Sequence, residues 1–320
     1  MKTEIGGYFE LEELTGREYY PGLYHLNLGR TALTYLAKCR GYRKLYLPVF
    51  LCDSVPEACT AAGIELDWYS MDENASPLLD HKCADDEAVY LVSYYGHLTD
   101  AAILAYQEQF RNVIVDHTHA FFQKPLSGVD TLYSVRKYFG VSDGAYLATD
   151  LSLQEAFSNL PADLSAGRMS HILGRYEENA GKYYQAMLDN AGTYHQAPIR
   201  KMSKLTQNLL KGIDYETVKQ RRLDNYLYLK KALPSDHPFS GIVPEGPFCY
   251  PYYHKDGMTL RKKMAAEKIF VPTYWSNVVR DAAPESAEYD WAANILPLPC
   301  DQRYGREEMA KVVDILKKCL

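Results

Sequence analysis

The sequence predicts an α/β fold with a mainly parallel sheet, followed by a smaller C-terminal α+β domain. Short apolar runs with β-branched or aromatic residues recur at 44–50, 64–70, 88–95, 112–116, 130–135 and 144–149. Helix-like segments separate most of these runs, at 30–40, 54–63 and 99–110. This alternation is typical of parallel strands whose connecting helices cover the faces of the sheet. From about residue 151 the strand pattern stops, so the sheet belongs to the first half of the chain.

The second half of the chain has a different pattern. Polar-apolar helical stretches occupy residues 151–235, most clearly 215–233. A mixed pattern follows at 248–253, 260–275 and 294–299, and an amphipathic helix closes the chain at 306–319. We therefore assign residues 1–210 to a large α/β domain that binds the ligand and residues 211–320 to the small α+β domain.

Composition narrows the classes of protein to consider. The chain has 320 residues, of which 47% are hydrophobic and 24% charged, so it can bury a large core. The net charge of −6 gives no general electrostatic reason to bind nucleic acid or an anionic membrane. The first residues are acidic rather than basic then apolar, and no apolar run approaches the roughly 18 residues of a membrane span. We expect a soluble cytoplasmic protein.

The seven cysteines indicate neither a disulfide framework nor a thiolate zinc site. They are odd in number, scattered along the chain, and never arranged as C-x-x-C. This usage fits a reducing cytoplasm.

Polar residues gather at the predicted strand ends, where ligands bind in open α/β sheets. The segments at these strand ends are Pro48 to Asp53, Tyr95 and Gly96, Asp116 to His119, and Ser134 to Lys137. No G-x-G-x-x-G or G-x-x-x-x-G-K loop is present, so the dinucleotide-binding and P-loop interpretations lose their main support.

The stretch "VIVDHTHAFF" (113–122) allows several interpretations. If the strand continues, His117 and His119 point to one face, and a His-x-His pair can hold a metal. The amidohydrolases have Asp-x-His-x-His at such a strand end, but here Asp116 directly precedes the first histidine. Two histidines hydrogen-bonded within a core are a further interpretation.

An organic cofactor is the other chemical interpretation. Pyridoxal 5′-phosphate (PLP) needs a lysine, an acid for its pyridine nitrogen, a flat partner for its ring and an anion cradle for its phosphate. The turn "LGRTALTYL" (28–36) opens a helix whose free N–H groups suit a phosphate. Asp116 and His119 follow one strand, and "SVRK" (134–137) closes the next with Lys137.

These segments also carry a family resemblance. The chain resembles the fold-type-I PLP enzymes, and within them the DegT/StrS sugar aminotransferases. The similarity lies in "LGRTAL" (28–33), "LPVFLCDSVPEACTAAGIELDWYSMD" (47–72), "VSYYGHLTD" (92–100), "VIVDHTHAF" (113–121), "SVRKYFGVSDGAYL" (134–147) and "ILPLPCDQRYGREEMAKVVDIL" (295–316). It implies a sheet of the seven-stranded type and a homodimer.

The resemblance also implies roles for individual residues. Lys137 would bind PLP covalently and move the proton, Asp116 would pair with the pyridine nitrogen, and His119 would pack on the ring. The phosphate would be held by Gly29, Arg30, Thr31 and Ser134, and Cys52 stands in the loop where the family often has an aromatic residue that covers the ring. Arg30 replaces a small hydroxyl residue, so it either contacts the phosphate or points outward.

We expect the function to be that of a PLP-dependent aminotransferase that moves an amino group, with glutamate as donor, onto a keto-sugar nucleotide for polysaccharide biosynthesis. A PLP lyase or dehydratase, a binding or regulatory protein with the same fold, and a metal-dependent hydrolase remain as alternatives. We expect the strand to end at Asp116 and the chain to turn, so that Asp116 and His119 both reach the ring. His117 receives no role.

Overall fold

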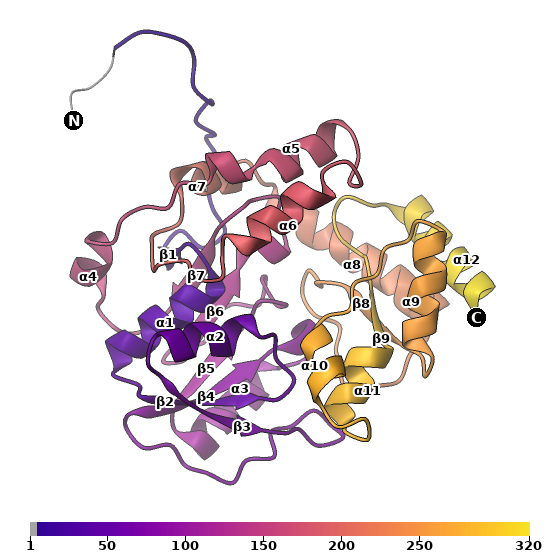
Figure 1. Cartoon of the computed structure of the whole chain (residues 1–320), viewed down its shortest axis with the longest axis horizontal. Coiled ribbons are helices and arrows are strands. Elements are labelled where there is room, and N and C mark those ends of the chain that lie inside the picture. Colours follow the sequence, from indigo (N-terminus) through magenta and orange to yellow (C-terminus); the bar gives the residue numbers. More distant parts are fainter. Residues whose placement is uncertain (1–4) are drawn as a thin grey trace.

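The computed structural model describes residues 5–320, and a seven-stranded sheet forms its centre (Figure 1). Residues 1–4, where the acidic N-terminal segment begins, lie outside the described residues. The strands are β1 (Tyr24–Leu26), β2 (Lys44–Pro48), β3 (Glu65–Tyr69), β4 (Glu87–Val92), β5 (Val113–Asp116), β6 (Asp130–Ser134) and β7 (Ala145–Ala148). Their order in the sheet is β1-β7-β6-β5-β4-β2-β3, and only β7 runs against both of its neighbours.

The predicted strands are confirmed, and the structure adds one. β5 is buried along its whole length, as a parallel strand covered on both faces should be. β1 was missed because it has three residues, too few to show an alternating pattern. The register places Val92 beside Asp116, so β4 and β5 end together at one edge of the sheet.

Helices α1 (Gly29–Arg40), α2 (Ser54–Ala61) and α3 (Asp100–Phe110) connect and cover these strands, as predicted (Figure 1). α1 ends at Gly41, whose left-handed backbone (φ 77°) suits glycine. α3 begins after Thr99, whose hydroxyl accepts a hydrogen bond from the backbone of Ala102. The short 3₁₀ helices η1 (Tyr94–Gly96) and η2 (Val135–Lys137) follow β4 and β6 directly.

A helical stretch follows the sheet, as the sequence predicts. It comprises α4 (Gln154–Ser158), η3 (Ala166–Arg168), α5 (Ser170–Glu177), α6 (Tyr184–Gly192), α7 (Lys204–Lys211) and α8 (Tyr215–Ala232). The α+β part then contains β8 (Tyr250–Tyr253), α9 (Gly257–Ala266), α10 (Ser276–Asp281), α11 (Ala287–Asn294), β9 (Ile295–Leu298) and α12 (Arg306–Cys319).

The C-terminal elements enclose a second hydrophobic core. β8 and β9 pair antiparallel, and α8, α9 and α12 pack around them (Figure 1). This core includes Tyr226, Leu260, Met264, Leu296 and Leu316. A small α+β unit is therefore present, whereas its boundary at residue 211 stays a prediction.

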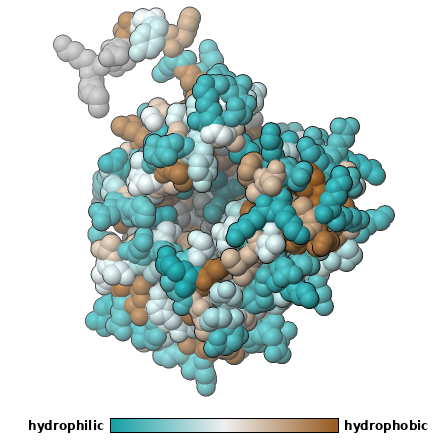
Figure 2. Space-filling view, turned by 45° about the vertical axis from the view of Figure 1, so that its right-hand side comes forward, coloured by the Kyte–Doolittle hydropathy of each residue, from teal (hydrophilic) through white to brown (hydrophobic). Residues whose placement is uncertain are grey.

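The surface of the described part is mostly hydrophilic in the view of Figure 2, where hydrophobic side chains form small separate groups. Within residues 5–320, no helix combines the length and the apolar character needed to cross a membrane.

Candidate active site

A cavity of about 430 Å³ opens at the carboxyl ends of the parallel strands. This is a typical volume for a small-molecule site, and the position is the one expected for the fold. The cavity brings together seven of the eight residues that the sequence predicts for the site: Gly29, Arg30, Cys52, Asp116, His119, Ser134 and Lys137. Thr31 is not among its lining residues.

Lys137 lies in the cavity because the backbone changes direction after β6. The strand ends at Ser134, and the η2 turn carries Lys137 to the sheet edge, where its exposed surface lines the cavity. Its Nζ lies 5.5 Å from the centre of the Tyr274 ring. Loss of hydration at the ammonium lowers the pKa of Lys137 and the neighbouring Arg136 lowers it further, whereas Asp116 opposes the decrease. A lysine of this kind is more readily neutral, as a base must be.

Asp116 closes β5 and is held by two hydrogen bonds. Its Oδ2 accepts from the hydroxyl of Tyr90 at 2.6 Å, and its Oδ1 accepts from the backbone N–H of Thr118 at 2.7 Å. Burial raises the pKa of Asp116, and these hydrogen bonds oppose the rise. The strand does end at Asp116 and a turn follows, so that prediction is confirmed.

The two histidines of this turn separate. The His119 ring stacks on Phe248, with centroids 4.2 Å apart and planes 16° from parallel, and lines the cavity. His117 is not among the lining residues; it is 1% exposed and packs against Tyr133. Burial lowers the pKa of His117 to about 3. A shared metal site of His117 and His119 therefore gains no support from their surroundings.

The N-terminus of α1 forms one end of the cavity. The space where Gly29 would carry a Cβ holds no protein atom within 4 Å, which leaves room for a ligand beside the free N–H groups of the first turn. Arg30 lines the cavity and donates a hydrogen bond to the Tyr194 carbonyl at 3.3 Å. The Thr31 hydroxyl instead donates to Asn27 Oδ1 at 2.6 Å, so it braces the helix start.

Arg136 adds a second guanidinium to this end, a role that the sequence reasoning did not assign. It lines the cavity, and its guanidinium carbon lies 4.0 Å from the centre of the Tyr194 ring. Burial lowers the pKa of both Arg30 and Arg136. Within residues 5–320 neither side chain forms an ion pair, so both are available to an anion.

Residues from the second half of the chain complete the cavity. Tyr274 and Trp275, just before α10, line it together with Cys52. The Trp275 ring packs 4.3 Å from that of Phe50, and its backbone has a left-handed φ of 55°, a conformation that a bulky residue rarely adopts. Sequence reasoning missed this pair because it lies more than 130 residues from Lys137 and follows no strand.

The side chains that line the cavity are of the chemical types that PLP binding requires. A lysine with a lowered pKa, a buried carboxylate, a stacked imidazole and an anion end with two arginines line one cavity. Lys137 would hold the aldehyde carbon, Asp116 the pyridine nitrogen, and the start of α1 with Ser134, Arg30 and Arg136 the phosphate.

Comparison with known proteins gives matches in structure alone. No protein-family model and no curated protein matches the sequence. The solved structure of DesI with its TDP-sugar product covers 92% of this chain and 80% of its own, at 16% identity and a TM-score of 0.65. A DegT DnrJ EryC1 StrS aminotransferase from Brucella abortus covers 92% of this chain and 85% of its own, at 15% identity and a TM-score of 0.57.

A third structure is the pyridoxamine phosphate (PMP) form of Spr1654 from Streptococcus pneumoniae. It covers 92% of this chain and 87% of its own, at 11% identity and a TM-score of 0.63. At these identities the comparison establishes the fold alone. The chain has the fold of the sugar aminotransferases of the DegT DnrJ EryC1 StrS type.

Proposed function

We propose that this protein is a PLP-dependent aminotransferase that transfers an amino group, from glutamate as donor, to the carbonyl of a keto-sugar nucleotide. The observation that carries the proposal is the convergence of Lys137, Asp116, His119 and the anion end of the cavity at one edge of the sheet. The shared fold with DesI, which was solved in the presence of its TDP-sugar product, supports the sugar nucleotide as substrate class.

Bound in this cavity, PLP would supply an electron sink for the negative charge that develops at Cα of the amino donor. Lys137 would act as the base there, because its Nζ loses a proton more readily than an ordinary lysine. The same Nζ would return the proton during amino transfer. Arg136 next to it keeps the local potential positive, which favours the neutral amine.

Asp116 would keep the pyridine nitrogen protonated. The hydrogen bonds from Tyr90 and Thr118 fix the carboxylate and favour its ionised form. The flat His119 side chain, backed by Phe248, would lie against the ring. Burial keeps the pKa of His119 well below its ordinary value, so it would be neutral at physiological pH.

We also propose that two copies of the chain form a homodimer. α5 and α6 lie side by side at the top of Figure 1 and expose large hydrophobic side chains, among them Leu173, Tyr176 and Tyr184. Large hydrophobic side chains that are exposed close together on a surface commonly mark an interface between proteins. Light scattering after size-exclusion chromatography tests this, and a monomeric mass at micromolar concentration would contradict it.

The decisive experiment is coenzyme binding followed by amino transfer. Purified protein mixed with PLP should develop a visible absorption band that sodium borohydride traps on Lys137, identified by peptide mass spectrometry. Glutamate should then bleach the band, and a keto-sugar nucleotide should restore it. Lys137→Ala should abolish the trapping, whereas Lys204→Ala, at the start of α7 and away from the cavity, should not.

Two outcomes would refute parts of the proposal. If the wild-type protein neither binds PLP nor is trapped with PLP by borohydride, the proposal that PLP is its coenzyme is refuted. A protein that binds PLP but is not bleached by glutamate or other amino acids would leave the coenzyme in place and exclude transamination.

A further inference from the structure

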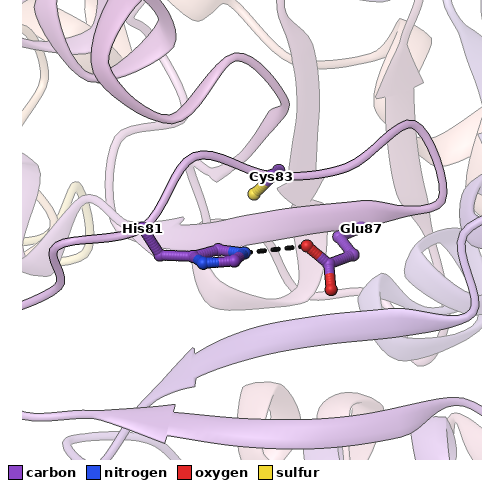
Figure 3. Close-up of side chains that lie close together, drawn as sticks. All are labelled: His81, Cys83 and Glu87. Atoms are coloured by element: carbon purple, nitrogen blue, oxygen red, sulfur yellow. Dashed lines mark hydrogen bonds and ion pairs between the residues drawn. The ribbon is translucent and has the colours of Figure 1, made fainter.

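Three potential metal ligands lie together at the opposite edge of the sheet from the cavity. Figure 3 shows His81, Cys83 and Glu87 with their side chains turned toward a common space. One nitrogen, one sulfur and one carboxylate oxygen from these residues all lie within 4.8 Å of one another. Glu87 begins β4, whereas the cavity lies beyond Val92 at the end of that strand. Five residues of strand correspond to about 17 Å, so the two places are distinct.

We propose that His81, Cys83 and Glu87 bind a zinc ion. Nitrogen, thiolate and carboxylate are the donor types that Zn²⁺ takes in proteins, and the imidazole–thiolate pair favours zinc over magnesium or calcium. Tetrahedral zinc holds such atoms about 3.3 to 3.8 Å apart, so the cluster would need small side-chain movements.

Charge balance supports this ligand set. A thiolate and a carboxylate together neutralise the two positive charges of zinc, and neutral imidazole adds none. The His81 Nε2 and Glu87 Oε2 atoms lie 2.8 Å apart with one proton between them, and zinc would replace that proton. The nearby cation Lys44 is already balanced, because its Nζ lies 3.5 Å from Glu65 and 3.3 Å from Asp67.

The backbone around the cluster is already fixed. The amide of Asn112 donates to the carbonyls of Ala84 and Glu87, at 2.9 Å each, and the Cys83 N–H donates to the Phe110 carbonyl at 3.1 Å. The loop that carries His81 and Cys83 is therefore tied to β4 and β5 without a metal. Preorganised ligands reduce the cost of binding.

Tyr46 of β2 supplies the outer contact that zinc ligands usually have. Its hydroxyl lies 3.4 Å from Glu87 Oε1, beside the fourth corner of the site; it also lies 2.9 Å from His81 Nε2, and that hydrogen bond would be given up when the nitrogen binds zinc. Such neighbours orient the ligands and tune the affinity. A water held by Tyr46 would complete the tetrahedron.

Cobalt substitution tests the site in the full-length, tag-free protein. After treatment with chelator and desalting, Co²⁺ should bind at one equivalent, with the strong visible bands of tetrahedral cobalt and a thiolate-to-cobalt band in the near ultraviolet. Zn²⁺ should bleach these bands by displacement. His81→Asn should weaken Co²⁺ and Zn²⁺ binding at least tenfold, the lower end of what even an outer-contact change costs.

Two further variants give the experiment its controls. Cys83→Ser should remove the near-ultraviolet band; if this buried variant does not fold, His81→Asn still decides, since His81 is about one-third exposed. Cys39→Ser, a partly buried cysteine on α1, should bind cobalt like the wild type. Absence of cobalt uptake, or equal uptake by wild type and His81→Asn, would overturn the proposal. The test needs no coenzyme, so its outcome is independent of the proposed activity.

Discussion

The hydrogen bond from Tyr90 to Asp116 allows a quantitative test of the coenzyme site. Tyr90 is 2% exposed, and its hydroxyl lies 2.6 Å from Asp116 Oδ2. A hydrogen bond to a charged group contributes about 1.5 to 3 kcal/mol. Tyr90→Phe should therefore raise the pKa of Asp116 further above its ordinary value.

The consequence is weaker PLP binding, because the ionised carboxylate is the form that pairs with the pyridine nitrogen. Where Asp116 is protonated in the free protein, the same energy corresponds to an increase in Kd of about ten- to 150-fold, and at higher pH the increase is smaller. The increase should be larger at pH 6 than at pH 8, since a lower pH protonates a carboxyl group with a raised pKa. Equilibrium titration with PLP, followed by absorbance, measures the Kd at each pH.

The matched control is Tyr250→Phe. Tyr250 is also buried and also donates one hydrogen bond, to the Leu233 carbonyl at 2.5 Å, but it lies in the small unit. This variant should bind PLP within about twofold of the wild type. Equal Kd values for wild type and Tyr90→Phe at both pH values would refute the assigned role of the hydrogen bond and put Asp116 itself in doubt.

Two further predictions follow from the same site, and a third concerns the buried His117 beside it. Arg136→Gln should raise the Kd for PLP at least tenfold and leave the Kd for pyridoxal, which lacks the phosphate, unchanged, because a charge-assisted contact contributes about 1.5 to 3 kcal/mol; equal losses for both compounds would contradict a phosphate contact. The acid limb of the kcat–pH profile should lie below the ordinary lysine pKa, because burial lowers the pKa of Lys137 and activity rises as Nζ loses its proton; a limb near 10.5 would contradict this. The pKa of His117 is about 3 in the folded protein against 6.5 for an ordinary histidine, so the unfolded chain binds the extra proton between these pH values and stability falls as the pH drops. His117→Phe should remove about 2 kcal/mol of the loss in unfolding free energy between pH 7.5 and 5, measured with urea, and an unchanged loss would exclude this source.

The sequence locates the site because parallel strands end at a common edge. The apolar runs before Asp116 and Lys137 are long enough to be recognised as strands, and the register then brings their ends together. Lys137, Asp116 and His119 therefore line one cavity although no local pattern joins them. The helix start at Gly29 follows from its turn and the apolar period behind it.

The residues that sequence reasoning missed share a physical cause. On a continuing strand Arg136 would point away from Lys137, but the η2 turn begins at Val135 and brings both to the cavity. Tyr90 lies two residues before the end of β4, and its long side chain spans the roughly 7 Å of strand to reach Asp116. Trp275 arrives through tertiary packing alone.

The same limit applies to the His81 cluster. Cysteine spacing gave no indication of a metal site, because recognised zinc motifs place two ligands of one kind close together. Here a single cysteine meets one histidine and one acid across a loop and the start of β4. Only the folded loop shows that their ligand atoms converge.

The charges of the cavity support the proposal that it holds a phosphate without the hydroxyl residue that usually follows the glycine. The cavity is lined by three basic residues, Arg30, Arg136 and Lys137, and by one opposing carboxylate, Asp116. Basic side chains therefore outnumber acidic ones around it. Burial lowers the pKa of all three cations, which means that each loses hydration that the protein does not fully replace. A phosphate dianion would replace it, and the planar guanidinium groups match phosphate geometry better than a hydroxyl does. In the proposed site Arg30 would contribute by pointing inward, and Tyr194 holds both Arg30 and Arg136 at one end of the cavity.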